Sequence, residues 1–128
     1  MPSALAWLLV ALGGALGAVA RFAVGTLIAR RFPTAQLPLG TLLINVSGCL
    51  MIAVFLSAAA SRSSLQEGLR YLFPIGFVGA YTTFSTYEWE LWRLGEQRAW
   101  ATAGLYFVLS NAVGFAAIAL GSALGRRL

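Results

Sequence analysis

Neutral hydrogen-bond donors recur at helical spacing inside two long apolar segments. In each segment two donors and a glycine share one face of a helix. The first set is Thr41, Asn45 and Gly48, and the second is Tyr106, Ser110 and Gly114. Amide and hydroxyl donors can replace the water around a small anion without supplying a fixed positive charge that would trap it. The spacing therefore indicates two helix faces suited to an anion in transit.

Aromatic ring edges add to this pattern. Phe84 and Tyr87 are three residues apart and share a helix face, and the edge of an aromatic ring is the positive end of its quadrupole. The plainer interpretation is that Thr41, Asn45 and Ser110 only hold helices together, through interhelical hydrogen bonds of about 0.6 kcal/mol each. For any one residue taken alone, that packing role is the simpler explanation.

The elements that carry these residues are predicted to be membrane helices. Of 128 residues, 59% are hydrophobic and 10% are charged, against about 25% charged in soluble domains. A span needs roughly 20 apolar residues and must be helical, since lipid offers no partners for backbone amides. We expect an all-α membrane protein, a single domain over residues 1–128, with four transmembrane helices at about 4–29, 38–60, 69–94 and 100–124. The first is expected to be a retained helix and not a cleaved signal peptide, because no basic start precedes it.

The third span is unusual at its centre. Gly76 and Gly79 are followed by Thr82 and Thr83, and each glycine lowers helix propensity by about 1 kcal/mol relative to alanine. A break would free carbonyls at membrane depth, which is tolerated where they line a cavity or bind an ion. The alternative is a glycine-rich packing face whose threonines bond back to their own helix. Spacing alone leaves both open.

The charged residues are balanced between the two ends of the predicted bundle. The net charge of +5 concerns membrane orientation first, and no nucleic-acid partner is expected. One end would hold four arginines and the other end four more: Arg62, Arg70, Arg126 and Arg127 against Arg30, Arg31, Arg93 and Arg98. The positive-inside rule then gives no preferred orientation. This balance is either chance or the sign of dual topology, with copies inserted both ways up and paired antiparallel.

Few other groups offer chemistry. Arg21 is the only charge inside the first span and either snorkels to an interface or faces a wet vestibule. The carboxylates are expected in or beside loops: Glu67, Glu88, Glu90 and Glu96. Cys49 has no second cysteine, and the chain has no histidine, so neither a disulfide nor a conventional catalytic set is indicated. Gly13 and Gly17 have the spacing that lets two helix backbones approach closely.

Three segments resemble the signatures of the Fluc (CrcB) fluoride channels. They are GGALGAVAR at 13–21, GTLLINVSG at 40–48 and GAYTTFSTY at 79–87, whose TTFST core is complete. The resemblance runs in order along nearly the whole chain. It implies an antiparallel homodimer in a bacterial inner membrane that exports fluoride through two separate pores.

The resemblance also implies roles for particular residues. The fluoride pathway would be lined by Asn45, Phe84, Tyr87, Thr41, Tyr106, Ser110 and Ser85, with Arg21 and Glu90 near its ends. The third helix would break, and the carbonyls of Gly79 and Thr82 from both subunits would hold a structural sodium ion at the dimer centre. Two positions depart from the family: Tyr87 stands where phenylalanine is usual, and Ala80 where glycine is frequent. The tyrosine hydroxyl needs a partner, and it could donate to the ion or narrow the pore.

Two other classes of function compete with a channel. A small multidrug-type proton-coupled exporter also has four spans, but it needs a carboxylate within the membrane, and the first span has Arg21 and no acid. A non-conducting accessory subunit, held by its glycine faces, would not need Asn45 or Phe84. An enzyme is disfavoured for want of an acid–base pair.

Overall fold

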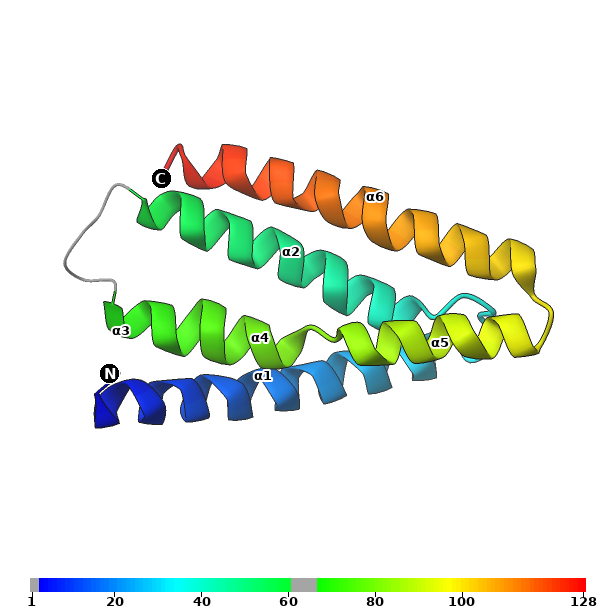
Figure 1. Ribbon diagram of the computed structural model, residues 1–128, viewed down its shortest axis with the longest axis horizontal. Helices are drawn as coiled ribbons and strands as arrows, with labels where there is room; N and C mark the ends of the chain where they lie inside the picture. Colours follow the sequence, from blue (N-terminus) through cyan, green and yellow to red (C-terminus); the bar gives the residue numbers. More distant parts are fainter. Residues whose placement is uncertain (1–2, 61–66) are drawn as a thin grey trace.

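Three long helices dominate the computed structural model, which describes residues 3–60 and 67–128 (Figure 1). All regular structure in those ranges is helical. Helices α1 (Ala4–Arg31), α2 (Leu39–Ala59) and α6 (Trp100–Gly125) are long and apolar enough to cross a membrane. The shortest, at 21 residues, is about 30 Å long, which matches a bilayer core. The expected all-α membrane protein is confirmed to this extent.

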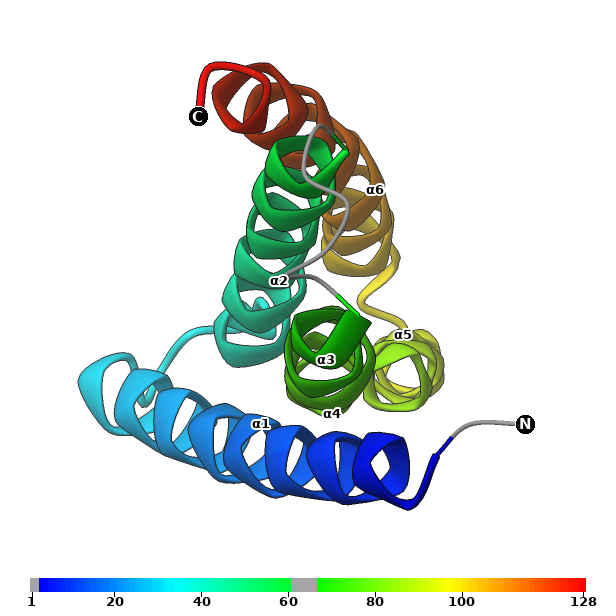
Figure 2. The same ribbon diagram turned by 90° about the vertical axis from the view of Figure 1, so that its left-hand side faces the viewer.

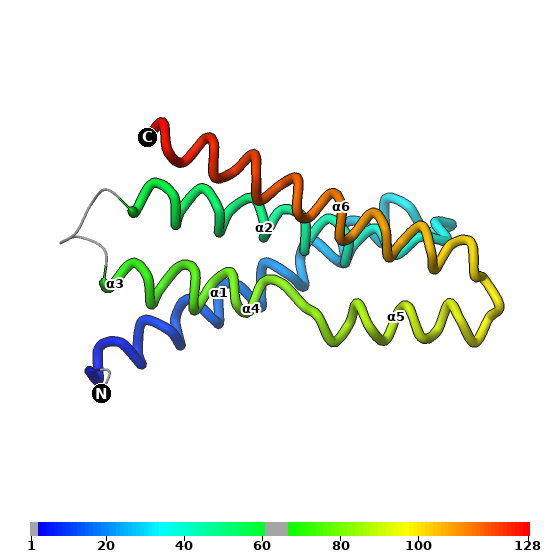
Figure 3. Tube along the Cα trace, turned by 45° about the horizontal axis from the view of Figure 1, so that its top comes forward, coloured from blue at the N-terminus to red at the C-terminus, as the bar shows by residue number. Residues whose placement is uncertain are grey.

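The segment between α2 and α6 is a succession of shorter helices. They are α3 (Glu67–Arg70), the π-helix η1 (Tyr71–Val78), α4 (Gly79–Tyr81) and α5 (Phe84–Glu96). Between α4 and α5 the backbone is extended, with ψ 161° at Thr82 and φ −152°, ψ 116° at Thr83. Figure 3 shows the run from α3 to α4 and the run of α5 joined by this short non-helical stretch. The interruption falls at the Gly–Thr sequence that the third predicted span contains.

Pro74 explains why the backbone hydrogen bonds of η1 do not follow the α-helical pattern. Proline has no amide hydrogen, and in an α-helix its ring clashes with the carbonyl four residues earlier. Pro74 lies buried in the middle of η1, whose wider turns displace that carbonyl. This π-helical stretch is not among the features predicted from the sequence.

Close helix packing depends on glycine. A Cβ on Gly13 or Gly17 would clash with backbone atoms of Leu72 or Phe77, so α1 lies directly against η1, as the four-residue spacing predicted. Gly121 and Gly125 give α6 the same close approach to α2. Figure 2 shows α2 and α6 side by side, with the α3–α4 run between α2 and α1.

Many apolar side chains lie on the outer surface of the chain. Leu5, Leu8, Leu12, Leu16 and Val19 on α1 are each at least half exposed. The buried cluster is small and consists of Tyr87, Leu94 and Tyr106. Such a surface suits lipid or a second copy of the chain.

Candidate functional site

The break between α4 and α5 is held by one amide side chain. Asn45 on α2 accepts a hydrogen bond from the Thr83 amide through Oδ1 (2.8 Å) and donates Nδ2 to the Thr83 carbonyl (3.0 Å). An extended residue inside a helical segment frees both of these backbone groups, and at membrane depth each needs a partner. Asn45 supplies both from a single position.

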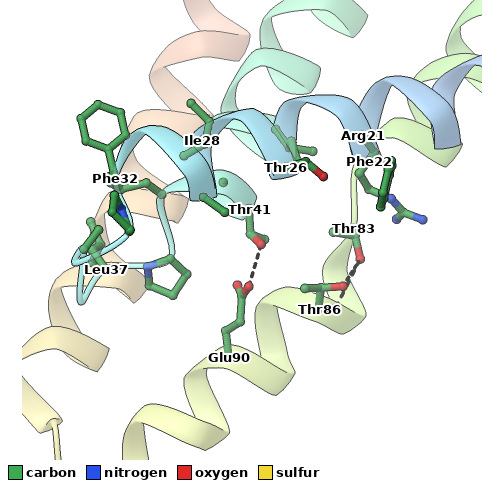
Figure 4. Close-up of a pocket in the computed structure, with 18 residues that line it drawn as sticks. Arg21, Phe22, Thr26, Ile28, Phe32, Leu37, Thr41, Thr83, Thr86 and Glu90 are labelled. Carbon is green, nitrogen blue, oxygen red and sulfur yellow. Dashed lines mark hydrogen bonds between the residues drawn. The ribbon is translucent and has the colours of Figure 1, made fainter.

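Thr82 and Thr83 make further hydrogen bonds at the two helix ends that meet in the break. Thr83 caps α5: its Oγ1 accepts from the Thr86 amide (3.3 Å) and donates to Thr86 Oγ1 (3.0 Å; Figure 4). Thr82 ends the preceding run and donates its Oγ1 back to the Val78 carbonyl (2.9 Å). Ser85, predicted along the pathway, is exposed on the first turn of α5, with its Oγ 3.5 Å from Thr83 Oγ1.

Arg21 turns toward the break. Its guanidinium Nη1 donates to the Thr82 carbonyl (3.3 Å), and the side chain is half-buried. Arg21 and Glu90 line the same hollow of about 600 Å³ between α1, α2 and α5 (Figure 4). The Arg21 side chain therefore borders both this hollow and the break.

Glu90 joins three helices. Its two carboxylate oxygens accept hydrogen bonds from Thr41 Oγ1 on α2 (2.8 Å) and from the Tyr106 hydroxyl on α6 (2.7 Å). The expectation that Glu90 lies in or beside a loop is wrong, because α5 continues to Glu96 and places Glu90 in its interior. The two hydroxyls compensate the carboxylate for the water it loses there. Thr41 and Tyr106, predicted on separate faces, thus meet through Glu90.

The aromatic rings form a contiguous group. Tyr87 is 7% exposed and meets Tyr106 edge to face, with the ring centroids 5.2 Å apart and an interplanar angle of 64°. Phe84 lies 6.0 Å from Tyr87 and is 73% exposed. Phe84 also lines a hollow of about 260 Å³ with Asn45 and Cys49. Tyr87 is therefore turned into the helix bundle, whereas Phe84 presents most of its ring outward.

Two residues of α6 complete the site. The Ser110 hydroxyl is buried without a hydrogen-bond partner among the described residues. Its neighbour Asn111, which the sequence analysis did not single out, donates Nδ2 to the Tyr87 hydroxyl (3.1 Å) and to the Phe107 carbonyl (2.8 Å). The signal that could have found Asn111 was present, since an amide inside an apolar segment must have a partner.

The carbonyls of Gly79 and Thr82 have the chemistry for a cation site. The Thr83 amide donates to Asn45, so it leaves the Gly79 carbonyl without its usual helical donor. The Thr82 carbonyl accepts one long bond from Arg21 and keeps a second lone pair. Two carbonyl oxygens are too few to replace the water around a cation, so a second copy of the chain would have to supply further carbonyl oxygens. In the part of the chain that the structure describes, no group of three or more His, Cys, Asp or Glu side chains offers another metal site.

The chain is similar to known proteins over most of its length. The family model described as "CrcB-like protein, Camphor Resistance (CrcB)" matches residues 8–122. A protein of Acidobacterium capsulatum is 46% identical over 122 residues, which cover 95% of this chain and 97% of the relative. Relatives from a Synechococcus strain and from Solibacter usitatus are each 40% identical, covering 91% and 94% of this chain and 89% and 98% of their own lengths. All three relatives are named "Fluoride-specific ion channel FluC".

Proposed function

This chain belongs to the CrcB-like protein family, and from that premise we propose that it is a fluoride ion channel and not an enzyme. The name shared by its relatives supports fluoride as the ion. The apolar helices support a place in a lipid bilayer, and we assign the chain to a bacterial inner membrane, where it would let fluoride leave the cytoplasm.

The observation that carries this proposal is the Ser110 hydroxyl. A buried hydroxyl with no partner is destabilising by about 1–3 kcal/mol. A fluoride ion passing Ser110 would accept that hydrogen bond, so the unpaired group has a use in transport that a packing role does not give it. Ser110 is also one turn from Tyr106, whose own hydroxyl is already bonded to Glu90.

We place the pathway along the residues that the break gathers. Arg21 and Glu90 would stand in the hollow at one end, where the positive group attracts the anion and the carboxylate holds the Thr41 and Tyr106 hydroxyls. Further in, the donors and ring edges would be those of Asn45, Ser110, Phe84, Tyr87 and Ser85. Passage then needs donors strong enough to replace water and weak enough to release the ion.

We further propose that residues 67–96 cross the membrane as one broken span, which makes four spans per subunit. Two copies would pair antiparallel and form two pores, because the arginines are balanced between the ends and Phe84 lies open on the outside of the subunit. Arg62, one of the eight balanced arginines, lies outside the described residues.

We also propose a structural sodium ion at the centre of this dimer. The Gly79 and Thr82 carbonyls of both copies would hold it, and its charge would stabilise the two breaks against each other. A crystal structure of the dimer, grown with sodium as the only alkali cation, should show one density peak on the dimer axis bonded to these carbonyls. A peak elsewhere, or no peak at all, would contradict the sodium proposal.

Fluoride efflux from liposomes that hold the purified protein tests the channel. We expect passive fluoride efflux far above chloride efflux. Asn45→Asp should abolish it, because the carboxylate places a second acceptor against the Thr83 carbonyl and a negative charge beside the ion. Phe84→Ile should also abolish it by removing the ring edge, with the dimer intact in size-exclusion chromatography. Equal fluoride and chloride efflux would exclude a fluoride channel, and efflux that requires a proton gradient would favour the proton-coupled exporter.

A further inference from the structure

The hydroxyl of Tyr87 has no role in a pathway built on ring edges alone. Tyr87 lies between two residues of the proposed pathway, with its ring 6.0 Å from that of Phe84 and 5.2 Å from that of Tyr106. A phenylalanine would make the same ring contacts. The hydroxyl is therefore an additional polar group at membrane depth, and the structure pairs it with Asn111.

The direction of the Asn111 hydrogen bonds can be established from chemistry. The Phe107 carbonyl can only accept, so the Asn111 atom that lies 2.8 Å from it must be the amide nitrogen. That nitrogen carries two hydrogens, and its second partner is the Tyr87 oxygen at 3.1 Å. Tyr87 is thus the acceptor in this bond, and its own hydrogen remains to be donated elsewhere.

The residues around the Tyr87 hydroxyl suit an anion as the acceptor of its hydrogen bond. Tyr106, Ser110 and Asn111 lie on α6 within about one and a half turns, and Tyr87 packs on this stretch. The Ser110 hydroxyl is likewise an unused donor. The amide that donates to the Tyr87 oxygen also polarises its O–H bond, which makes the hydroxyl a stronger donor.

We propose that Asn111 is a positioning residue, which holds the Tyr87 hydroxyl so that its hydrogen is offered to fluoride in transit. This inference rests on the proposed channel function and adds a binding step that a phenylalanine at position 87 would not provide. An O–H donor binds an anion more strongly than a ring edge, so the step should lower the fluoride concentration at which flux saturates and slow the ion's release.

The test is the dependence of initial fluoride efflux on fluoride concentration in proteoliposomes. Tyr87→Phe should raise the half-saturating concentration about tenfold or more, the loss expected for one hydrogen bond to a charged group, without lowering the maximal rate. Asn111→Leu, which keeps a side chain of similar size at this exposed position, should raise the half-saturating concentration by a smaller factor of about three, because the hydroxyl remains but is no longer oriented. In the Tyr87→Phe background, Asn111→Leu should add nothing.

Tyr71→Phe is the matched control, since it removes a tyrosine hydroxyl from the start of η1, beside Ser3 and Glu67. It should leave the curve unchanged. A purely structural role would lower the number of active vesicles and leave the half-saturating concentration unaltered. Thermal unfolding with increasing fluoride gives a second measure of affinity that does not depend on flux.

The inference is overturned if Tyr87→Phe leaves the half-saturating concentration within twofold of the parent. It is also overturned if Asn111→Leu raises the half-saturating concentration in the Tyr87→Phe background as much as it does in the parent. In both cases the parent still conducts fluoride and the proposed function stands. A parent protein without fluoride efflux would instead overturn the channel itself, and this inference with it.

Discussion

At the scale of single residues, Asn45 holds the backbone at the break, and in the proposed channel it would also donate to the ion. Asn45 uses its oxygen and one amide hydrogen on Thr83, and its Nδ2 carries a second hydrogen that these bonds do not use. The same side chain can therefore hold the break and still donate to an anion. A serine or threonine, with one hydrogen, could not do both.

Glu90 shows how a carboxylate is accommodated between packed helices. Its charge is offset by hydrogen bonds from two hydroxyls, with oxygen–oxygen distances of 2.8 Å to Thr41 and 2.7 Å to Tyr106. Arg21 lines the same hollow and adds a positive charge there. In the proposed channel, a carboxylate already bonded in this way would compete less with fluoride for donors in that hollow.

Tyr106→Phe tests this coupling. The ring, which is fully buried, should stay in place, while Glu90 loses one of its two hydroxyl partners. We expect the free energy of unfolding to fall by about 1.5–3 kcal/mol, as for a hydrogen bond to a charged group, and fluoride flux to fall with it. Unfolding by denaturant in detergent measures the first effect. If the stability of the variant equals that of the parent, the bond to Glu90 does not contribute to folding.

At the scale of elements, the glycine–threonine sequence combines both predicted features: a helix break and a threonine that bonds back to its own helix. Thr82 bonds back to the Val78 carbonyl within its own run, as threonines in packed membrane helices do. Thr83, the next residue, leaves the helix and caps α5. Two adjacent threonines thus end one helical run and begin the next, and the extended backbone between them points its polar groups at α2 and α1.

Gly48 gives the break its space on α2. A Cβ at this position would clash with the Thr82 methyl group. Gly48→Ala should therefore displace the break from Asn45, lower stability by about 1–3 kcal/mol and reduce fluoride flux. Gly104→Ala is the control, because no atom lies within 4 Å of a Cβ there and alanine favours the helix. If both variants conduct like the parent, the contact between Gly48 and Thr82 does not limit function.

At the scale of the whole molecule, the charged and aromatic residues mark two ends. The start of α1, the start of α3 and the end of α6 lie together at one end, and the end of α1, the end of α5 and the start of α6 at the other (Figure 1). Described arginines occur at both ends, and Trp7 near one end and Trp100 at the other are exposed, as in interfacial belts. Neither end is marked as cytoplasmic by its charge.

Orientation should therefore respond to small changes in charge. Replacing Arg126 and Arg127 by alanine leaves two of the four arginines at the end that holds the C-terminus, against four at the other end. A reporter at the C-terminus should be found on both sides of the membrane in the parent and mainly outside in the variant. The matched control replaces the same two residues by lysine and should keep both orientations.

Flux provides the second half of that test. If two pores need antiparallel copies, the alanine variant should lose fluoride efflux and regain it when co-expressed with a variant biased the opposite way, Arg30→Ala with Arg31→Ala. Full efflux from copies locked in one orientation would show that the antiparallel dimer is not required.

Hydrophobicity, charge and glycine spacing determine much of this protein without reference to its tertiary structure. The all-helical class and the close approach of Gly13 and Gly17 to a neighbour follow from local rules, because lipid forces backbone groups to pair within a helix. The glycine–threonine sequence located the irregular backbone to within a few residues but left its form open. The π-helical turns around Pro74 also have a local cause, although the sequence analysis passed over it.

Only the tertiary structure decided which polar groups meet. Asn45 and Thr83 are 38 residues apart, and Thr41 and Glu90 are 49 apart, so no local pattern could pair them. The position of Glu90 inside the bundle and the bond between Asn111 and Tyr87 depend on how α2, α5 and α6 pack. A donor's spacing on its own helix fixes the face it occupies, whereas its hydrogen-bond partner is set by the helices that cover that face.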